Sequence, residues 1–319
     1  MYEASQLIFY YAVSPVHMGA GSAIGAIDSP IQREVHTKHP MFAGSGLKGA
    51  LRHHLGSAWK AHGSDQDAPG GLINRIFGPD TGASDHAGAF SLSDAQLLAL
   101  PVRSLKGAFA YVTSPLALAR MCRLLAQKAV APEWTVPAIS EGNCLVASAG
   151  LLNGKQLILE SFEFDAQVSP SMASIASWIA ERALPGDSNN FFRAKLSTDL
   201  VLLNDTDFAH FARHAMVVEP HVRIDDKSGT ADDGGLFYVE NLPPETLMVG
   251  LAQASLERRK NNGRDAGASP LLTAQEVLAK VFPGIETNSP AACGMLIQIG
   301  GDASTGRGMV LLQPCAMAS

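Results

Sequence analysis

The sequence predicts an α+β fold, and three observations support that prediction. Helical and strand-like segments follow one another irregularly along the 319 residues, without the strict alternation of a parallel doubly wound sheet. The composition, with 46% hydrophobic and 17% charged side chains, allows the chain to bury a sizeable core. The 30 glycines and 18 prolines predict many turns and long excursions between regular elements.

Five segments have the character of strands. The clearest is 7–13, which is rich in β-branched, aromatic and aliphatic residues and stops at Ser14-Pro15, so we expect a buried first strand. Shorter apolar runs predict four more strands, at 89–92, 157–164, 295–299 and 309–312. After the first strand the chain runs through a long glycine-rich and polar loop to Pro40, and long loops in compact domains are usually functional or disordered.

The first helix is expected to begin at Ser45, whose hydroxyl can cap free amide groups. Apolar residues then recur at three-and-four spacing from Leu47 to Trp59, while Lys48 and Arg52 share another face. Later helices have recognisable start signals, which are Ser114-Pro115, Ser169-Pro170, Asn204-Asp205 and the capping box from Thr273 to Glu276.

The segment 221–240 differs from the rest of the chain. Val222 and Ile224, and then Leu236 and Tyr238, alternate with other residues around a polar, acidic stretch at 225–235. This pattern predicts a β-hairpin with a long acidic tip. Because a hairpin this polar buries little by itself, we expect it to project from the body and to be steadied by a partner.

The charge balance excludes a general polyanion-binding surface. The chain has 24 Lys and Arg against 30 Asp and Glu, a net charge of -6, so any binding of nucleic acid has to be local. The window 29–63 carries five cations, one acid and five histidines, whereas acids outnumber cations from 221 to 241. The positive charge is therefore concentrated near the first helix.

The four cysteines are widely scattered, without a C-x-x-C motif, so neither a zinc cage nor a disulfide framework is indicated. A reducing cytoplasm fits this usage best. The sequence has no basic flank with an apolar h-region near its first residue, and no uncharged apolar run approaches the roughly 18 residues of a membrane span. We expect a cytoplasmic protein that does not enter a membrane.

The spacing of the glycines argues against three common nucleotide or hydrolase motifs. The run from Gly19 to Gly25 is one residue too long for the dinucleotide fingerprint, and Asp28 lies too close to be the ribose-binding acid. The run from Gly44 to Lys48 lacks the P-loop frame, and no G-x-S-x-G elbow occurs.

Two glycine-rich segments could nevertheless bind phosphate. In the first, Gly44 and Ser45 would expose amides at a helix N-terminus, with Lys48 and Arg52 adding full charges; the alternative is a glycine-capped core helix with solvated cations. The second lies between two apolar strands, where successive amides could form an anion-binding nest beside Arg307; the alternative is an ordinary hairpin turn. The candidate residues of the second segment are Gly301, Thr305, Gly306, Arg307 and Gly308.

Asp28 and a histidine pair are the remaining candidates. Asp28 lies in the loop between the glycine-rich stretches and the basic segment, where an acid would repel phosphate unless it were needed; the alternative is a simple turn residue before Ser29-Pro30. His210 and His214, four residues apart on a presumed helix, could hold a metal, but no third ligand accompanies them. An exposed helix face is the alternative.

Seven segments, in matching order and spacing, together resemble one family. They are SPVHMGAG at 14–21, IDSPIQREVHT at 27–37, GSGLKGALR at 44–52, LPVRSLKG at 100–107, VRIDD at 222–226, GLFY at 235–238 and the glycine-rich run at 300–308. The family is the RAMP-superfamily backbone subunit of type III-B CRISPR effector complexes, that is, the family of the fourth Cmr protein. Since the segments span nearly the whole chain, the resemblance is far more specific than any single glycine loop.

The resemblance implies a single RAMP domain over residues 1–319, with a modified RRM or ferredoxin-like palm, long insertions and a β-hairpin thumb at 215–242. It also implies that copies of the chain stack with other Cmr subunits into a filament along a CRISPR guide RNA. The thumb would then lever a nucleotide out of the guide–target duplex at regular intervals, and the two glycine-rich segments would bind guide phosphates.

The resemblance further implies a metal-dependent endoribonuclease that cleaves target RNA, with Mg²⁺ the expected divalent metal. Asp28 falls on the family's catalytic aspartate and is a possible metal ligand, and His17 and Arg223 are added as RNA-binding residues. Gly46 replaces a polar residue common in the family. Two other hypotheses stay open: a non-catalytic scaffold for guide RNA, and a standalone zinc enzyme built on His210 and His214.

Overall fold

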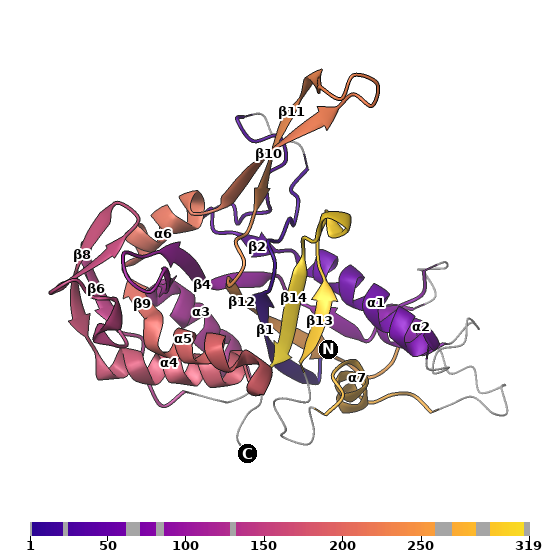
Figure 1. The fold of residues 1–319 in the computed structure, drawn as a ribbon. Coiled ribbons are helices and arrows are strands. Elements are labelled where there is room, and N and C mark those ends of the chain that lie inside the picture. Colours follow the sequence, from indigo (N-terminus) through magenta and orange to yellow (C-terminus); the bar gives the residue numbers. More distant parts are fainter. Residues whose placement is uncertain are drawn as a thin grey trace.

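The computed structural model describes residues 2–21, 25–61, 71–80, 86–127, 132–258, 270–284 and 294–315. It confirms the α+β prediction: helices pack on a large mixed sheet, and a separate two-stranded hairpin projects from one edge of the body (Figure 1). Residues 22–24 of the first glycine-rich loop and Cys293 lie outside the described residues. Cys122 and Cys144 are free thiols.

Four strands form a ferredoxin-like palm. β1 (Ala4–Ala12), β4 (Ala95–Arg103), β12 (Leu247–Ala254) and β14 (Met309–Pro314) lie in the order β14-β1-β12-β4, and each pair of neighbours is antiparallel. The helices α1 (Gly44–Ala61) and α7 (Ala274–Val281) supply the two crossovers of the β-α-β-β-α-β motif. The short strands β2 (Met41–Phe42), β3 (Phe90–Leu92) and β13 (Met295–Gln298) pair with β4, β12 and β14.

A long insertion between β4 and the hairpin extends the same sheet. Its strands, added beyond β4, are β5 (Phe109–Thr113), β9 (Leu200–Leu203), β6 (Asn143–Val146), β8 (Phe162–Val168) and β7 (Gln156–Leu159). Its helices are α3 (Pro115–Ala126), α4 (Pro170–Ala183), α5 (Asn190–Asp199) and α6 (Asp205–His214). One short helix, α2 (Leu72–Phe77), follows α1. No described helix combines the length and the hydropathy that crossing a lipid bilayer requires.

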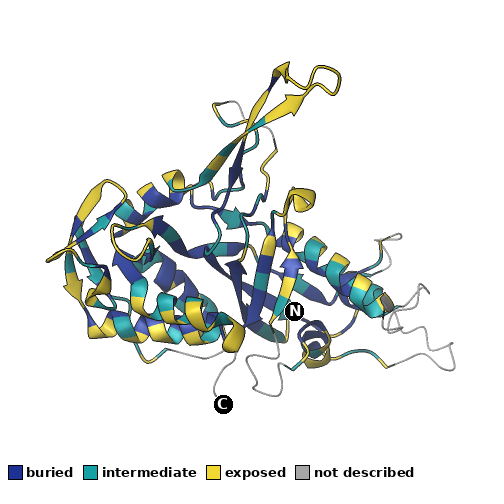
Figure 2. Cartoon of the chain, in the orientation of Figure 1, coloured by how far each residue is buried: buried dark blue, intermediate teal, exposed yellow. Residues whose placement is uncertain are grey.

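The core lies on both faces of the palm sheet (Figure 2). On β1, Leu7, Phe9 and Tyr11 pack with residues of α3 and α4, whereas Ile8 and Tyr10 pack with residues of α1 and α7. Successive side chains of a strand point to opposite faces, so a strand covered on both sides has to be apolar throughout. This explains the continuous apolar run that predicted the first strand.

The helix start signals were correct at four positions and wrong at one. The side chains of Ser114, Ser169, Asn204 and Thr273 accept hydrogen bonds from amides of the following turn. Ser45, however, does not cap α1. The helix begins one residue earlier, at Gly44, whose amide donates to the Asp94 carboxylate at 2.8 Å, so a side chain distant in the sequence satisfies the first amide.

One strand prediction was also wrong. The segment 157–164 is not one strand but a hairpin of β7 and β8, in which Leu159 pairs with Phe162. Glu160 lies in the turn between them with φ of 53°, in the left-handed region. The apolar composition on both sides of this two-residue turn concealed it.

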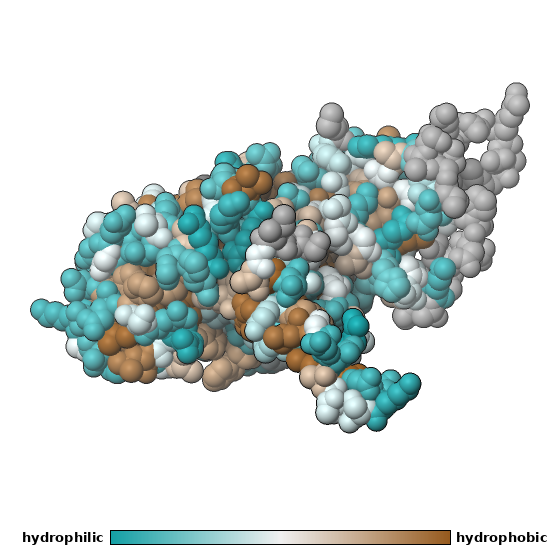
Figure 3. Space-filling view, turned by 90° about the horizontal axis from the view of Figure 1, so that it is seen from above, coloured by the Kyte–Doolittle hydropathy of each residue, from teal (hydrophilic) through white to brown (hydrophobic). Residues whose placement is uncertain are grey.

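The projecting hairpin consists of β10 (Val217–Ile224) and β11 (Ala231–Asn241), paired from Val217 and Asn241 at the root outward. Most of it is exposed (Figure 2). Seen from above, its tip is hydrophilic and hydrophobic residues lie toward its root (Figure 3). The exposed apolar side chains include Val218, Val222, Leu236 and Phe237, which are between 42% and 54% exposed. Exposed apolar side chains on a projecting element indicate a surface that binds a partner molecule.

Candidate nucleic-acid interface

Segments that are far apart in the sequence meet at the root of the hairpin (Figure 1). Ser29 forms a parallel bridge with Val239 of β11, and Val16 forms an antiparallel bridge with Leu242, directly after β11. The loop between β13 and β14 joins them through amide-to-carbonyl hydrogen bonds of 2.8 Å to the segment around Val16. The structure therefore brings together the loop of Asp28, the segment of His17 and the second glycine-rich segment.

The Asp28 carboxylate is exposed and is held against the hairpin. Its Oδ2 accepts a hydrogen bond from the Tyr238 amide at 2.8 Å, and Ser29 pairs with the backbone of β11 on either side of Val239. Within the described residues, Oδ1 has no partner. The carboxylate is thus fixed in position by a strand 210 residues away, while one oxygen remains available to bind a ligand or accept a proton.

His17 is oriented by the same strand. Its Nδ1 lies 2.7 Å from the carbonyl oxygen of Glu240, and because a carbonyl can only accept, Nδ1 carries the proton. The free nitrogen is therefore Nε2. A Cβ added at Gly19 would lie 2.9 Å from Nε2, so the glycine keeps this nitrogen uncovered. His17 and Asp28 both depend on β11 for their orientation.

At the start of α1, the donors differ in part from those the sequence predicted. The Gly44 amide is occupied by Asp94, and a Cβ at Gly44 would lie 2.4 Å from the carbonyl oxygen of Leu92, so this glycine serves close packing. The amides of Ser45 and Gly46 are exposed and have no partner within the described residues. The N-terminus of α1 keeps two donors for an anion.

The two cations of α1 have different roles. Arg52 donates to the Gly78 carbonyl and to the Asn74 side chain, and forms an ion pair with Asp80 at 2.8 Å. Lys48 makes no hydrogen bond or ion pair in the part of the chain that the structure describes, and burial together with the nearby Arg52 charge lowers its pKa. A phosphate at Lys48 would relieve this unfavourable environment, whereas Arg52 is already committed to α2 and the residues that follow it.

In the loop between β13 and β14, the amides of the five predicted residues all donate hydrogen bonds to carbonyl oxygens of the protein. The acceptors are the carbonyl oxygens of His17 for Gly301, Asp302 for Thr305 and Arg307, Ala303 for Gly306, and Pro15 for Gly308. Within the described residues, the amides of this loop without a partner are those of Gly300 and of three consecutive exposed residues, Asp302, Ala303 and Ser304, of which Asp302 has φ of 59°. Consecutive free amides beside a left-handed residue are suited to an anion. A nest of successive amides was predicted for this segment, but not which of its amides would be free, because that depends on bonds to Pro15 and His17.

The two cations assigned to RNA outside α1 lie in different places. Arg307 is at the hairpin root, where its guanidinium pairs with the Glu219 carboxylate of β10. Arg223 is far out on β10, 76% exposed, with its Nη1 3.7 Å from Asp232. The structure therefore brings Arg307 to the hairpin root, where the segments of Asp28, His17 and 300–308 meet, which we call the junction. It leaves Arg223 on the distal part of the hairpin.

The two glycine-rich segments both contact the stretch of His17 and Met18. A Cβ at Gly46 would lie 3.3 Å from the Met18 sulfur, and the Gly301 amide donates to the His17 carbonyl at 2.8 Å. Both segments, each of which has free amides, are therefore joined through the short stretch that presents His17. Donors gathered from separate segments in this way can act together on a polyanion.

The described residues do not form a metal site of their own. Asp28 is a single carboxylate, and nowhere in the described ranges do three or more His, Cys, Asp or Glu residues cluster as metal ligands. The neighbouring acid Glu240 is buried and paired with Arg33. His210 and His214 are exposed with ring centroids 4.8 Å apart, but His210 packs against Phe162.

Three acids that organise the junction could not be recognised from the sequence. Asp94 occupies the first amide of α1, Glu219 pairs with Arg307, and Glu240 holds the loop that follows Asp28. Each acts on a segment distant in the chain. Glu240 follows the apolar and aromatic run Phe237-Tyr238-Val239, which was the one weak sign in the sequence that its carboxylate is buried.

Comparison with known proteins identifies relatives over almost the entire chain. The family model of the RAMP superfamily matches residues 9–310. A curated relative, the CRISPR system Cmr endoribonuclease Cmr4 of Pyrococcus furiosus, is 32% identical over 306 residues, which cover 95% of this chain and 93% of the relative. The match includes the hairpin and every segment of the junction.

Solved structures agree in fold. The crystal structure of oligomeric Cmr4 from Pyrococcus furiosus superposes with a TM-score of 0.68 at 26% identity, covering 99% of both chains. A chain of the type III-B Cmr-beta complex bound to cognate target RNA, solved by cryo-EM, superposes with a TM-score of 0.68 at 19% identity, covering 98% of both chains. At that lower identity the likeness concerns the fold alone.

Proposed function

The chain belongs to the RAMP superfamily, and we propose that it is a backbone subunit of a type III-B CRISPR effector complex that binds guide RNA and cleaves target RNA. In this proposal the whole chain is one RAMP domain and the hairpin, with its flanking residues 215–242, is the thumb. Its partners are guide and target RNA, further copies of itself and other Cmr subunits. The curated relative Cmr4 of Pyrococcus furiosus and the crystal structure of oligomeric Cmr4 support these assignments.

The observation that carries the proposal is the junction at the root of the hairpin. An exposed carboxylate and an open imidazole nitrogen are both oriented by β11, and two glycine-rich segments with unpaired amides contact the stretch that carries the imidazole. Together with the unpaired Lys48, these amides supply donors for phosphate on an otherwise acidic protein. Phosphate contacts of this kind fix the position of RNA without reading its sequence, which suits a subunit whose specificity comes from base pairing.

The hairpin suits insertion into a nucleic-acid duplex. Its exposed apolar side chains extend along both strands from Val218 to Ile224, and the ring of Phe237 stacks on His221 with centroids 5.3 Å apart. Apolar and aromatic side chains of this kind can replace a base in a stack. We propose that the thumb displaces one nucleotide of the target, which kinks the backbone beside Asp28.

The chemistry we propose is attack by the ribose 2′-oxygen on its own 3′-phosphorus. The bond from the 2′-oxygen to phosphorus forms, the bond from phosphorus to the 5′-oxygen breaks, and the products are a 2′,3′-cyclic phosphate and a 5′-hydroxyl. Asp28 accepts the proton of the 2′-hydroxyl, and protonated His17 donates a proton from Nε2 to the departing 5′-oxygen. Target RNA with a 2′-deoxy sugar at the cleaved position should therefore bind and resist cleavage.

The direct test is Asp28→Asn in the assembled complex with guide RNA. Removal of a general base should lower the cleavage rate by about 10²- to 10⁴-fold, while target RNA still binds, because the amide can still accept from Tyr238. The matched control is Asp226→Asn, which neutralises an exposed acid at the hairpin tip and should leave cleavage unchanged. Full cleavage by Asp28→Asn would instead favour the alternative function, a non-catalytic scaffold that holds guide RNA.

We also propose that cleavage requires a divalent cation, with Mg²⁺ the first candidate. Where the free oxygen of Asp28 acts as the base, RNA phosphate oxygens and water would have to hold the cation. Chelation with EDTA should stop cleavage and leave target RNA bound, and added Mg²⁺ should restore the rate. Cleavage at an unchanged rate in EDTA would contradict metal dependence without affecting the assignment of Asp28.

A further inference from the structure

Glu240 joins the hairpin to two separate segments. It is only 4% exposed, and each of its polar groups has a partner. Its amide donates to the Ser29 carbonyl at 3.0 Å, its carbonyl accepts from His17, and its carboxylate accepts from the Ile31 amide at 3.0 Å and from the Arg33 guanidinium. One residue of β11 thus fixes the backbone that follows Asp28 and the imidazole of His17.

Arg33 connects Glu240 to the other root of the hairpin. Its Nη1 donates to the Ala212 carbonyl at 2.8 Å and its Nη2 to the Arg213 carbonyl at 3.4 Å, in the last turn of α6. α6 leads directly into β10, while Glu240 lies near the end of β11. The carbonyl end of a helix favours a cation, so the guanidinium is stabilised by both partners. A single side chain therefore bridges the two places where the hairpin enters and leaves the body.

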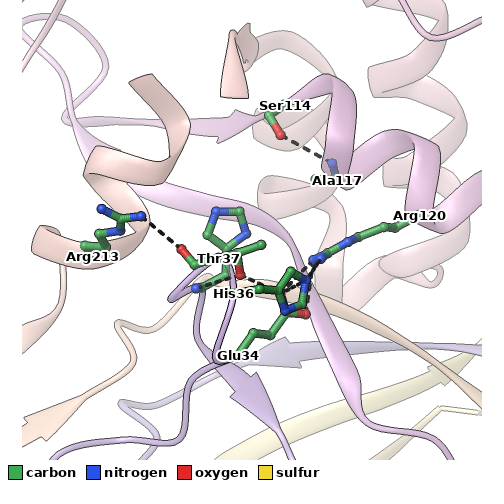
Figure 4. Close-up of polar contacts among 8 residues, drawn as sticks. Glu34, His36, Thr37, Ser114, Ala117, Arg120 and Arg213 are labelled. Atoms are coloured by element: carbon green, nitrogen blue, oxygen red, sulfur yellow. Dashed lines mark hydrogen bonds and ion pairs between the residues drawn. The ribbon is translucent and has the colours of Figure 1, made fainter. Parts of the chain in front are cut away.

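The next residue, Glu34, anchors the same loop to the palm. Its carboxylate pairs with Arg120 of α3 at 3.0 and 3.1 Å, and both side chains are buried (Figure 4). Thr37 also donates to this carboxylate, and the Thr37 carbonyl accepts from Arg213. Arg33 and Glu34 thus form a two-residue link, in which one side chain holds the hairpin and its neighbour holds α3.

We propose that Arg33 is a positioning residue that, through Glu240, holds the hairpin and the Asp28 carboxylate as one unit in a fixed direction on the palm. The inference rests on the proposed function. Asp28 accepts from the amide of Tyr238, two residues before Glu240, so a change in the direction of β11 moves the carboxylate with the hairpin. The direction of the thumb then determines which phosphate of the target is cut.

The test compares Arg33→Met and Glu240→Gln with the unchanged protein, each assembled with guide RNA and supplied with saturating target RNA. Misplacement of a reacting group by about 1 Å can lower a rate by on the order of 10²-fold, so we expect cleavage to slow by about 10- to 100-fold while target affinity is unchanged. We also expect products cut at neighbouring positions. The matched control is Lys280→Ala, which removes an exposed cation from the last turn of another helix, α7, leaves Arg33 and Glu240 paired, and should cut as the unchanged protein does.

A second variant separates positioning from stability. Arg33→Met leaves the Glu240 carboxylate buried without its cation, which can unfold the junction, whereas Arg33→Met combined with Glu240→Leu removes both charges and folds more readily. Positioning predicts that the double variant assembles, binds target and still cuts slowly at displaced sites. Arg33→Lys, which keeps the charge but cannot span both roots, should give an intermediate rate.

Two results would overturn the inference. One is a double variant that cuts at the original rate and positions, and the other is a parallel loss of target affinity and cleavage in every variant, which indicates a merely structural role. If Asp28→Asn is inactive in the same assay, the proposed function survives either result. If Asp28→Asn cleaves normally, the catalytic proposal fails first and the positioning role fails with it.

Discussion

The start of α1 and the loop between β13 and β14 both bring a glycine against a neighbouring backbone, but they do so in different conformations. Gly44 is the first residue of a right-handed helix, and the close approach of the Leu92 and Ser93 backbone is what excludes a side chain. Gly300 has φ of +81°, and a Cβ there would also lie 2.3 Å from the His17 carbonyl oxygen. The first site needs glycine for space alone, whereas the second needs it for space and for backbone conformation.

The two regions also differ in the donors left for RNA. The start of α1 keeps the amides of Ser45 and Gly46 and the ammonium of Lys48, while Arg52 is bound to other protein groups. The other loop keeps three consecutive amides, at 302–304, but its one arginine is paired with an acid. In both regions one motif glycine, Gly44 or Gly300, serves close packing, and the groups available to RNA are those that the protein leaves unpaired.

Gly300→Ala should have the largest effect among the substitutions that separate the two regions. The unfavourable φ and the contact with the His17 carbonyl together should lower the free energy of unfolding by about 3 kcal/mol or more. Urea denaturation measures the loss. Gly301→Ala is the control, because its Cβ would meet only His17 Cδ2 at 3.5 Å and should cost less than about 1 kcal/mol. Equal losses for the two variants would show that the loop adjusts freely.

Much of the fold could be predicted because its signals are local. Serine, asparagine and threonine caps mark the starts of four helices within four residues, and the apolar run of β1 records burial on both faces. The turn at Glu160 and the start of α1 could not be predicted. The first requires a left-handed residue without glycine, and the second depends on Asp94, which is distant in the sequence.

The candidate site likewise combines residues that the sequence could identify with features that depend on distant residues. The resemblance to a known family drew attention to Asp28 and His17, and the structure brings the segments of both residues to the hairpin root. Which donors are free is a matter of long-range pairing. The partner of Arg307 lies 88 residues away and that of Arg33 lies 207 residues away, so no local pattern could separate these committed cations from Lys48.

Gly44→Ala should have the next largest effect, and it tests whether the first region tolerates a side chain. The helical conformation suits alanine, so the cost comes from the approach of an added Cβ to the Leu92 carbonyl oxygen at 2.4 Å and to the Ser93 carbonyl carbon at 2.9 Å, for which we expect about 1–3 kcal/mol. Thermal or urea unfolding gives the value. In Gly46→Ala, the control, the new Cβ meets only the flexible Met18 side chain at 3.3 Å, and stability should change by less than about 1 kcal/mol. A larger loss for Gly46→Ala would reverse this assignment.

Lys48→Ala and Arg52→Ala should separate RNA binding from stability within one helix. Arg52→Ala removes contacts to Asn74, Gly78 and Asp80 and should lower the free energy of unfolding by about 1–2 kcal/mol. Lys48→Ala should leave stability nearly unchanged and weaken guide RNA binding, with the slope of log affinity against log salt reduced by about one. Titration at several salt concentrations and urea unfolding provide the two measurements. If Arg52→Ala weakened guide RNA binding and Lys48→Ala did not, Arg52 would have to leave its protein partners when RNA binds.

Gly49→Ala should have the smallest effect, and it asks how far along α1 the RNA lies. Gly49 is exposed in the helix interior with no atom within 4 Å of an added Cβ, so alanine should raise the free energy of unfolding by about 0.5–1 kcal/mol. Gly56→Ala, whose Cβ would make an ordinary 3.8 Å contact with Ile73, is the matched control. If contacts with RNA end at the first turn and Lys48, both variants bind guide RNA normally. A Gly49→Ala variant that is more stable but binds guide RNA less tightly would mean that the RNA backbone approaches Gly49 closely. A motif glycine of the first region would then serve RNA binding directly.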